Sequence, residues 1–175
     1  SGTRVGLFVG WGARDAVGEV MDIAEWLEAP VATTLQGLSV FPANHPLHAG
    51  FGFGQSAVPA ARNAFKDCDV MLAVGTRFAE IATGSYGVTV PENLIHVDIN
   101  PDVFSANYPA KIGLDGDAGS VLRALLAALK QATPRRDVNH ALRNQLRDDK
   151  QAYRQSWYAH DSKGRVNPVR FFDEL

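Results

Sequence analysis

Several loops of this chain carry residues that could bind a phosphorylated ligand, and each loop follows a short apolar run. Glycine lets the backbone approach a phosphate group, and exposed N–H groups at helix starts attract anions. Arg77 could form a bidentate ion pair with a phosphate, and Asp98 could accept hydrogen bonds from ribose hydroxyls. The candidate ligand-binding residues are Gly10, Gly12, Thr34, Leu35, Gly75, Arg77, Asp98, Ile99, Gly116 and Asp117.

The same residues have a purely structural interpretation. Glycines at strand-to-helix turns are needed for chain reversal whether or not a ligand binds, and a lone Gly10-Trp11-Gly12 is weak support for a site. Arg77 could cap the end of a helix, and Asp98 could form a turn. A series of such loops at one sheet edge is stronger, because doubly wound sheets bind ligands outside the carboxyl ends of their strands.

The sequence motifs of several common enzyme and metal sites are missing from this chain. A nicotinamide dehydrogenase needs a third glycine where this chain has Asp15, and an acid where its second strand ends in Thr33-Thr34. The sequence has neither a nucleophile elbow nor a phosphate-loop lysine motif. His45 and His48 lie in a proline-rich loop without an acidic partner, which favours structural or solvent-facing roles over metal binding. We therefore assign no catalytic and no metal-binding residue.

Apolar runs alternate with helical patterns, which predicts the fold that positions these loops. The runs are apolar at nearly every residue, as expected of strands covered on both faces. Strand–helix–strand units of this length cross over right-handed and form parallel sheets. We predict an α/β, doubly wound, mostly parallel six-stranded sheet with helices on both faces, Rossmann-like and of the FAD/NAD-binding type. The apparent strands cover 5–9, 31–34, 70–74, 94–99 and 111–114, and the helices 16–28, 56–65 and 118–130.

Composition limits the partners and the compartment. The net charge of −2 gives no electrostatic reason to expect a nucleic acid or an anionic membrane as partner. No apolar run approaches the length of a membrane span. The single cysteine, Cys68, fits a reducing intracellular setting, and its surroundings predict a buried, unreactive thiol. We expect a cytoplasmic protein with neither a nucleic-acid nor a membrane partner.

The character of the chain changes after residue 130. A polar linker is followed by a charged, helix-prone stretch whose thin apolar stripe suits a connecting helix on the domain surface. Asn167-Pro168 then has the form of an N-cap followed by proline at the first helical position. We predict a nucleotide-binding-type domain over 1–130, a linker with a helix over 131–165, and over 166–175 the start of a further domain of a longer protein. The stripe consists of Leu142, Leu146, Tyr153 and Trp157.

Short motifs follow one another in a specific order between residues 5 and 129. They are Ala29-Pro30-Val31, Thr33-Thr34-Leu35-Gln36-Gly37, Phe41-Pro42, His45-Pro46-Leu47, Cys68-Asp69-Val70, Val74-Gly75-Thr76-Arg77-Phe78, Ile95-His96-Val97-Asp98-Ile99-Asn100-Pro101 and Gly116-Asp117-Ala118. Each motif is weak alone, but their order and spacing are specific. Together they resemble the central domain of thiamine-diphosphate-dependent enzymes, closest to the acetolactate synthase branch.

This resemblance implies a parent enzyme of three α/β domains that acts on 2-keto acids as a carboligase or decarboxylase. The first and third domains, from different subunits of a homo-oligomer, would hold thiamine diphosphate and Mg²⁺. They would also be this chain's partners, so the chain alone would be inactive. The tail over 166–175 resembles the entry into the third domain. In acetolactate synthases the central domain carries FAD in a structural role, in some relatives ADP, and in others nothing. The ten candidate residues match the positions of that nucleotide cleft.

A second hypothesis comes from a different functional class. The chain could be an independent regulatory module that senses an adenine nucleotide. The start of a further amphipathic helix at Asn167 favours the enzyme domain, because such a helix has little to pack on in a complete module.

Overall fold

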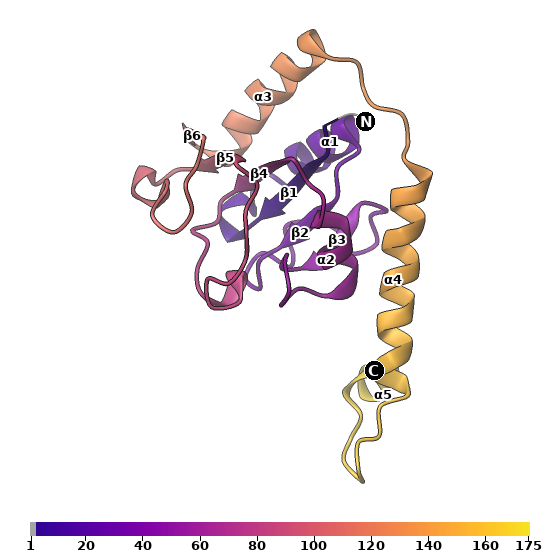
Figure 1. Ribbon diagram of the computed structural model, residues 1–175. Coiled ribbons are helices and arrows are strands. Elements are labelled where there is room, and N and C mark those ends of the chain that lie inside the picture. The colour runs from indigo at the N-terminus through magenta and orange to yellow at the C-terminus, as the bar shows by residue number, and fades with distance from the viewer. Residues whose placement is uncertain (1–2) are drawn as a thin grey trace.

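The computed structural model describes residues 3–175, which form one parallel sheet with helices on both faces (Figure 1). The strand order is β3-β2-β1-β4-β5-β6, and every neighbouring pair is parallel. The predicted doubly wound α/β fold is therefore confirmed. The strands are β1 (Val5–Val9), β2 (Val31–Thr33), β3 (His48–Phe51), β4 (Val70–Val74), β5 (Asn93–Asp98) and β6 (Ile112–Asp115).

The strand order creates a switch point between β1 and β4. From β1 the chain moves outward through β2 to β3, then returns to the other side of β1 and moves outward from β4 to β6. β1 is central, with Leu7 paired to Val31 on one side and to Leu72 on the other. Loops that leave β1 and β4 diverge to opposite sides of the sheet at such a point, which opens a crevice between them.

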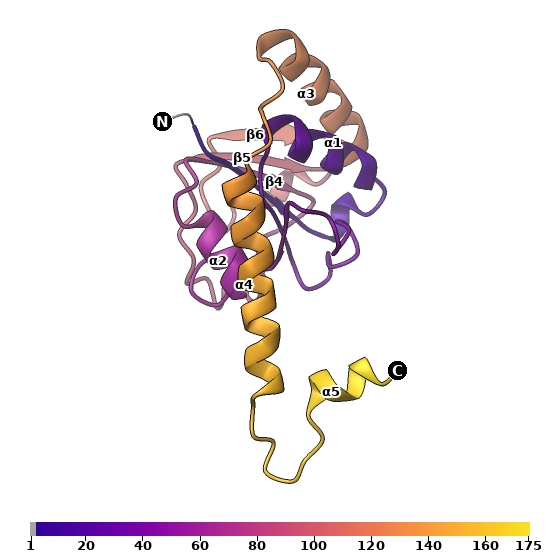
Figure 2. The same cartoon turned by 90° about the vertical axis from the view of Figure 1, so that its right-hand side faces the viewer.

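Two hydrophobic layers cover the two faces of the sheet. Successive residues of a strand point to opposite faces, so Leu7 and Val9 join one layer while Phe8 joins the other. α1 (Val17–Leu27) and α3 (Ala118–Ala132) pack on the first face. α2 (Pro59–Phe65) and α4 (His140–Tyr158) pack on the second, and Figure 2 shows α4 running alongside α2.

Most predicted boundaries lie within two residues of those observed, with one missed strand and one larger difference. β3 is a strand that the sequence did not reveal, because its residues His48–Phe51 include a glycine and no β-branched residue. α2 begins at Pro59 and not at residue 56, as its proline at the first position favours. No side chain caps the start of α1: Ala16 occupies the cap position, and Asp15 pairs with Arg14 at the exposed surface.

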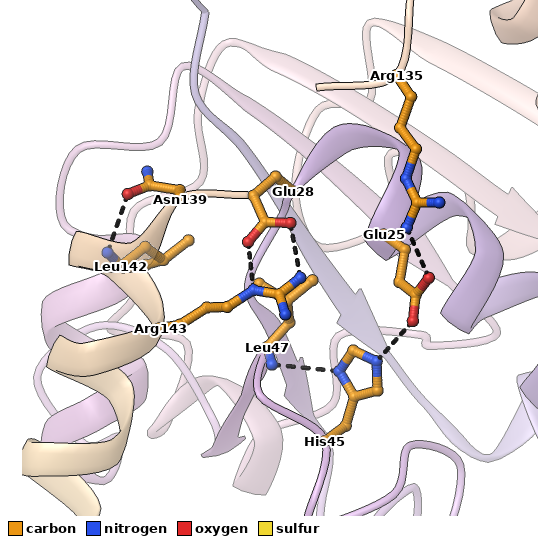
Figure 3. Close-up of polar contacts among 8 residues, drawn as sticks. All are labelled: Glu25, Glu28, His45, Leu47, Arg135, Asn139, Leu142 and Arg143. Atoms are coloured by element: carbon orange, nitrogen blue, oxygen red, sulfur yellow. Dashed lines mark hydrogen bonds and ion pairs between the residues drawn. The ribbon is translucent and has the colours of Figure 1, made fainter. Parts of the chain in front are cut away.

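α4 is bound more firmly to the domain than a surface connector would be. Leu146 is fully buried, and Leu142 contacts the hydrophobic layers of both faces. The guanidinium of Arg143 donates two hydrogen bonds to the carboxylate of Glu28, at 2.5 and 2.8 Å (Figure 3). The second half of the stripe is different, because Tyr153 and Trp157 stay 38% and 40% exposed.

The chain folds back at its C-terminal end. α5 (Pro168–Asp173) begins as predicted, with the side chain of Asn167 accepting hydrogen bonds from the Val169 and Arg170 amides. Arg154 of α4 pairs with Asp173 and fixes α5 beside the end of α4. Within residues 3–175, no helix combines the length and apolar character that a bilayer crossing requires.

Candidate functional site

The loops that follow β1, β2, β4 and β5 meet at the carboxyl edge of the sheet and enclose a cleft of about 400 Å³ over the switch point. A smaller hollow of about 170 Å³ adjoins it and shares Gly75 and Asp98. Leu35 and Gly116 lie on the same edge but line neither space. The predicted residues that line the cleft or the hollow are Gly10, Gly12, Thr34, Gly75, Arg77, Asp98, Ile99 and Asp117.

The glycines at the switch point pack against one another. A Cβ atom on Gly10 would lie 2.3 Å from the carbonyl oxygen of Gly75, and one on Gly75 would lie 2.5 Å from the amide nitrogen of Ala13. The Gly12 amide donates to the Gly75 carbonyl at 3.0 Å. These glycines are therefore required by chain packing, whether or not a ligand binds. Gly10 and Gly75 contribute only backbone to the lining of the cleft.

Three polar side chains at the rim of the cleft and the hollow, those of Thr34, Asp98 and Asp117, also stabilise their own turns. Asp98 Oδ1 accepts a hydrogen bond from the Asn100 amide at 2.9 Å, so the turn-forming interpretation of Asp98 is correct. Asp117 caps α3 by accepting from the amide and hydroxyl of Ser120, and these bonds lower the pKa of Asp117. Thr34 Oγ1 accepts from the Gly37 amide at 3.0 Å. These local bonds hold the rim in a fixed shape.

Three features bring positive charge to the cleft and the hollow: Arg77, the start of α1, and Arg14, which pairs with Asp15. Arg77 is exposed at the cleft, and none of the ion pairs in residues 3–175 involves its guanidinium. The first turn of α1 lies beside the hollow, and no side chain caps it. Free N–H groups and the helix dipole make such a start favourable for an anion. The start of α3 differs, since Asp117 already fills that role.

Residues 1–125 match the family described as thiamine pyrophosphate enzyme, central domain. The chain belongs to this family. It is 44% identical over 112 residues to a probable acetolactate synthase large subunit of Methanocaldococcus jannaschii, and the aligned segment covers 63% of this chain and 19% of that protein. It is 39% identical over 119 residues to a sulfoacetaldehyde acetyltransferase of Rhodobacter capsulatus, with 66% and 20% covered. An acetolactate synthase of Mycobacterium avium is 30% identical over 172 residues, with 97% and 28% covered.

This thiamine pyrophosphate enzyme central domain thus covers only a small part of the length of its relatives. It spans between 19% and 28% of the length of these three proteins. The similarity to the Mycobacterium avium protein extends over nearly the whole chain and so includes α4.

Sequence reasoning missed His96, which supports the rim from below. The imidazole is 1% exposed, and burial lowers its pKa, so the ring is neutral. Its Nε2 lies 2.7 Å from the Thr76 carbonyl oxygen and must be the donor, because a carbonyl can only accept. His96 therefore fixes the turn that carries Arg77. The only signal in the sequence was a histidine inside an apolar run.

The remaining candidates for chemistry have structural roles. His45 Nδ1 accepts from the Leu47 amide, and its Nε2 faces Glu25 at 3.3 Å, an acidic partner that the sequence did not predict (Figure 3). His48 lies in β3, where burial lowers its pKa to about 4. The Cys68 thiol donates to the Ala64 carbonyl, and burial raises its pKa to about 11. The part of the chain described here has no group of three or more His, Cys, Asp or Glu residues that could hold a metal ion.

Phe53, in the loop between β3 and α2 (residues 52–58), belongs to the core. Phe53 is 2% exposed and packs edge-on against Phe8, with ring centroids 4.7 Å apart. Phe78, from the loop after β4, packs on the same Phe8 ring at 5.8 Å. These aromatic residues fill the space under the rim and are not part of the cleft.

Proposed function

We propose that this chain is the central domain of a thiamine-diphosphate-dependent enzyme that acts on 2-keto acids, and that its cleft holds an adenine nucleotide, FAD or ADP. One observation carries the ligand assignment: the loops after four parallel strands enclose a cleft at the switch point, with Gly10 and Gly75 in its lining. Doubly wound sheets bind nucleotides at that place. The combined space lies in the range of small-molecule sites, about 300–1,000 Å³.

The residues of the cleft fit the parts of a nucleotide. Gly10 and Gly75 present backbone to the cleft, where a diphosphate would lie against it. The guanidinium of Arg77 and the uncapped start of α1 would bind the phosphate oxygens. The carboxylate of Asp98 would accept hydrogen bonds from ribose hydroxyls. Such a ligand would contribute structure and not redox chemistry.

The activity of the parent enzyme would depend on other domains. Thiamine diphosphate would supply the carbanion chemistry on the 2-keto acid, held with Mg²⁺ by the first and third domains of a homo-oligomer. The relatives include a protein named acetolactate synthase and one named acetyltransferase, which supports a transferase as the parent. Family membership also favours this role over an independent regulatory module.

Calorimetric titration with ADP and with FAD, after an absorbance scan of the purified protein, tests the ligand assignment. We expect saturable binding of at least one ligand. Arg77→Met should weaken binding roughly tenfold, because a charge-assisted hydrogen bond is lost. Arg147→Met is the matched control: Arg147 is exposed on α4, and its side chain pairs with Asp148 there. Absence of binding for both ligands at high micromolar concentration would leave the domain only a scaffold role.

The parent activity is tested separately on the full-length gene product. With thiamine diphosphate and Mg²⁺ supplied, we expect it to consume pyruvate or another 2-keto acid. A full-length protein that consumes no 2-keto acid under these conditions would contradict the proposed reaction while leaving the nucleotide cleft unaffected.

A further inference from the structure

Trp11 places a large aromatic ring at the mouth of the cleft. It begins the short helix η1 (Trp11–Ala13), directly after central β1, and it lines the cleft together with Arg77 and Asp98. Its side chain is not part of the core, and the residue is 51% exposed. Gly10 and Gly12 flank it, so its two immediate neighbours add no side chain over the ring. An indole left open beside a cleft is available to a ligand.

The surroundings of the ring favour stacking. The guanidinium of Arg14 lies over one face of the ring, 5.3 Å from the centroid, and this cation–π contact restrains the indole. Aromatic side chains bind nucleic-acid bases by offering such a ring as a platform, since every base has a π-face. The cleft therefore combines an aromatic ring, a guanidinium and a carboxylate, which are the groups that recognise a base, a phosphate and a ribose.

We infer that Trp11 is the ring-binding residue of the cleft and stacks on the base of a purine nucleotide. The inference rests on the proposed function and makes it more specific. It implies that the cleft selects a ligand with a planar base, so that ADP binds better than ribose 5-phosphate or inorganic pyrophosphate. Trp11 then acts in recognition, while Arg77 and the backbone hold the phosphates.

Tryptophan fluorescence can follow this contact directly once two of the three tryptophans of the chain are replaced. With Trp26→Phe and Trp157→Phe, Trp11 becomes the only tryptophan. We expect ADP to quench its emission saturably, and ribose 5-phosphate to have little effect at the same concentration. The midpoint should agree with the calorimetric affinity of the unchanged protein.

Substitutions at position 11 complete the test. Trp11→Ala should weaken ADP binding roughly fivefold or more, since a base-stacking ring is lost. Trp11→Phe should stay close to the unchanged protein, because a ring remains. Trp157→Ala is the matched control: Trp157 is similarly exposed, on α4, and should leave ADP affinity unchanged. Circular dichroism and the melting temperature verify that each variant is folded.

The outcomes separate this inference from the proposed function. If ADP binds the unchanged protein but Trp11→Ala binds it equally well or more tightly, the ring-binding role is wrong and the nucleotide cleft stands. Equal affinity for ADP and ribose 5-phosphate would also overturn the inference. If the unchanged protein binds neither ADP nor FAD, the proposed ligand and this role fail together.

Discussion

Replacing Arg143 by methionine tests whether the linker helix is held on the domain by a buried charge pair. Glu28 and Arg143 are far apart in sequence, and their side chains are only 4% and 25% exposed (Figure 3). Methionine keeps most of the apolar stem but removes the guanidinium. The Glu28 carboxylate then loses both hydrogen bonds in a place that water barely reaches.

The magnitude follows from this geometry. Removing one partner of a fully buried ion pair costs about 3–5 kcal/mol. The partial exposure of Arg143 lets some water reach the carboxylate, so we expect a loss of about 2–3 kcal/mol in the free energy of unfolding. For a chain of this size, that loss lowers the melting temperature by roughly 5–10 °C. Leu142 and Leu146 still hold α4, so the protein should remain folded.

Urea unfolding of a double-mutant cycle measures the effect. Glu28→Gln with Arg143→Met should be more stable than the sum of the single changes predicts, by about 1 kcal/mol or more, because no buried charge is left unpaired. Arg147→Met is the control, one turn further along α4, with a side chain 65% exposed. It should change stability by less than about 0.5 kcal/mol. If Arg143→Met behaved like Arg147→Met, the buried pair would not contribute to holding α4.

Three further changes test the rim and the buried titratable groups. Gly75→Ala should destabilise the protein by about 2 kcal/mol or more, because the φ of Gly75 is +59° and the added Cβ would meet backbone. Gly18→Ala is the control: a Cβ there would enter open space, so this change should be neutral or stabilising by roughly 0.5 kcal/mol. Equal urea midpoints for the two variants would contradict the packing argument. Burial lowers the pKa of His48 to about 4, against 6.5 in an unfolded chain. The stability that the neutral ring contributes is therefore complete above pH 6.5 and is lost as the pH falls toward 4, and unfolding curves should show a loss of roughly 3 kcal/mol in the free energy of unfolding. His48→Gln should reduce this loss, and an unchanged pH profile in that variant would be evidence against the burial argument. Burial raises the pKa of Cys68 to about 11, so at about pH 8 its alkylation should be roughly a hundredfold slower in the folded protein than in urea, and equal rates would show a reactive thiol.

The sheet and the position of the loops could be predicted because they depend on local pattern. β1 and β4 are unbroken apolar runs, and each matches its predicted bounds at 5–9 and 70–74. β3 could not be predicted, since His48–Phe51 is a strand through its pairing with β2 and not through its own residues. The general rule that carboxyl ends of parallel strands share an edge was enough to gather Gly10, Gly75 and Asp98.

The details of the site depend on contacts between distant residues, which no local pattern contains. The hydrogen bond from His96 to Thr76 and the close packing of Gly10 against Gly75 appear only once the strands are side by side. The burial of Leu146 likewise depends on how α4 meets α2. Trp11 was visible in the sequence, but its exposure at the cleft was not.

Amide chemical shifts recorded during an ADP titration test the central claim most directly. The account predicts shifts that saturate together and lie along the carboxyl edge, at Gly10, Thr34, Gly75, Asp98 and the first turn of α1. The amides of α2 and of α4 should stay unchanged. Shifts confined to those helices, or no shifts at ADP concentrations in the high micromolar range, would contradict a nucleotide cleft at this edge of the sheet.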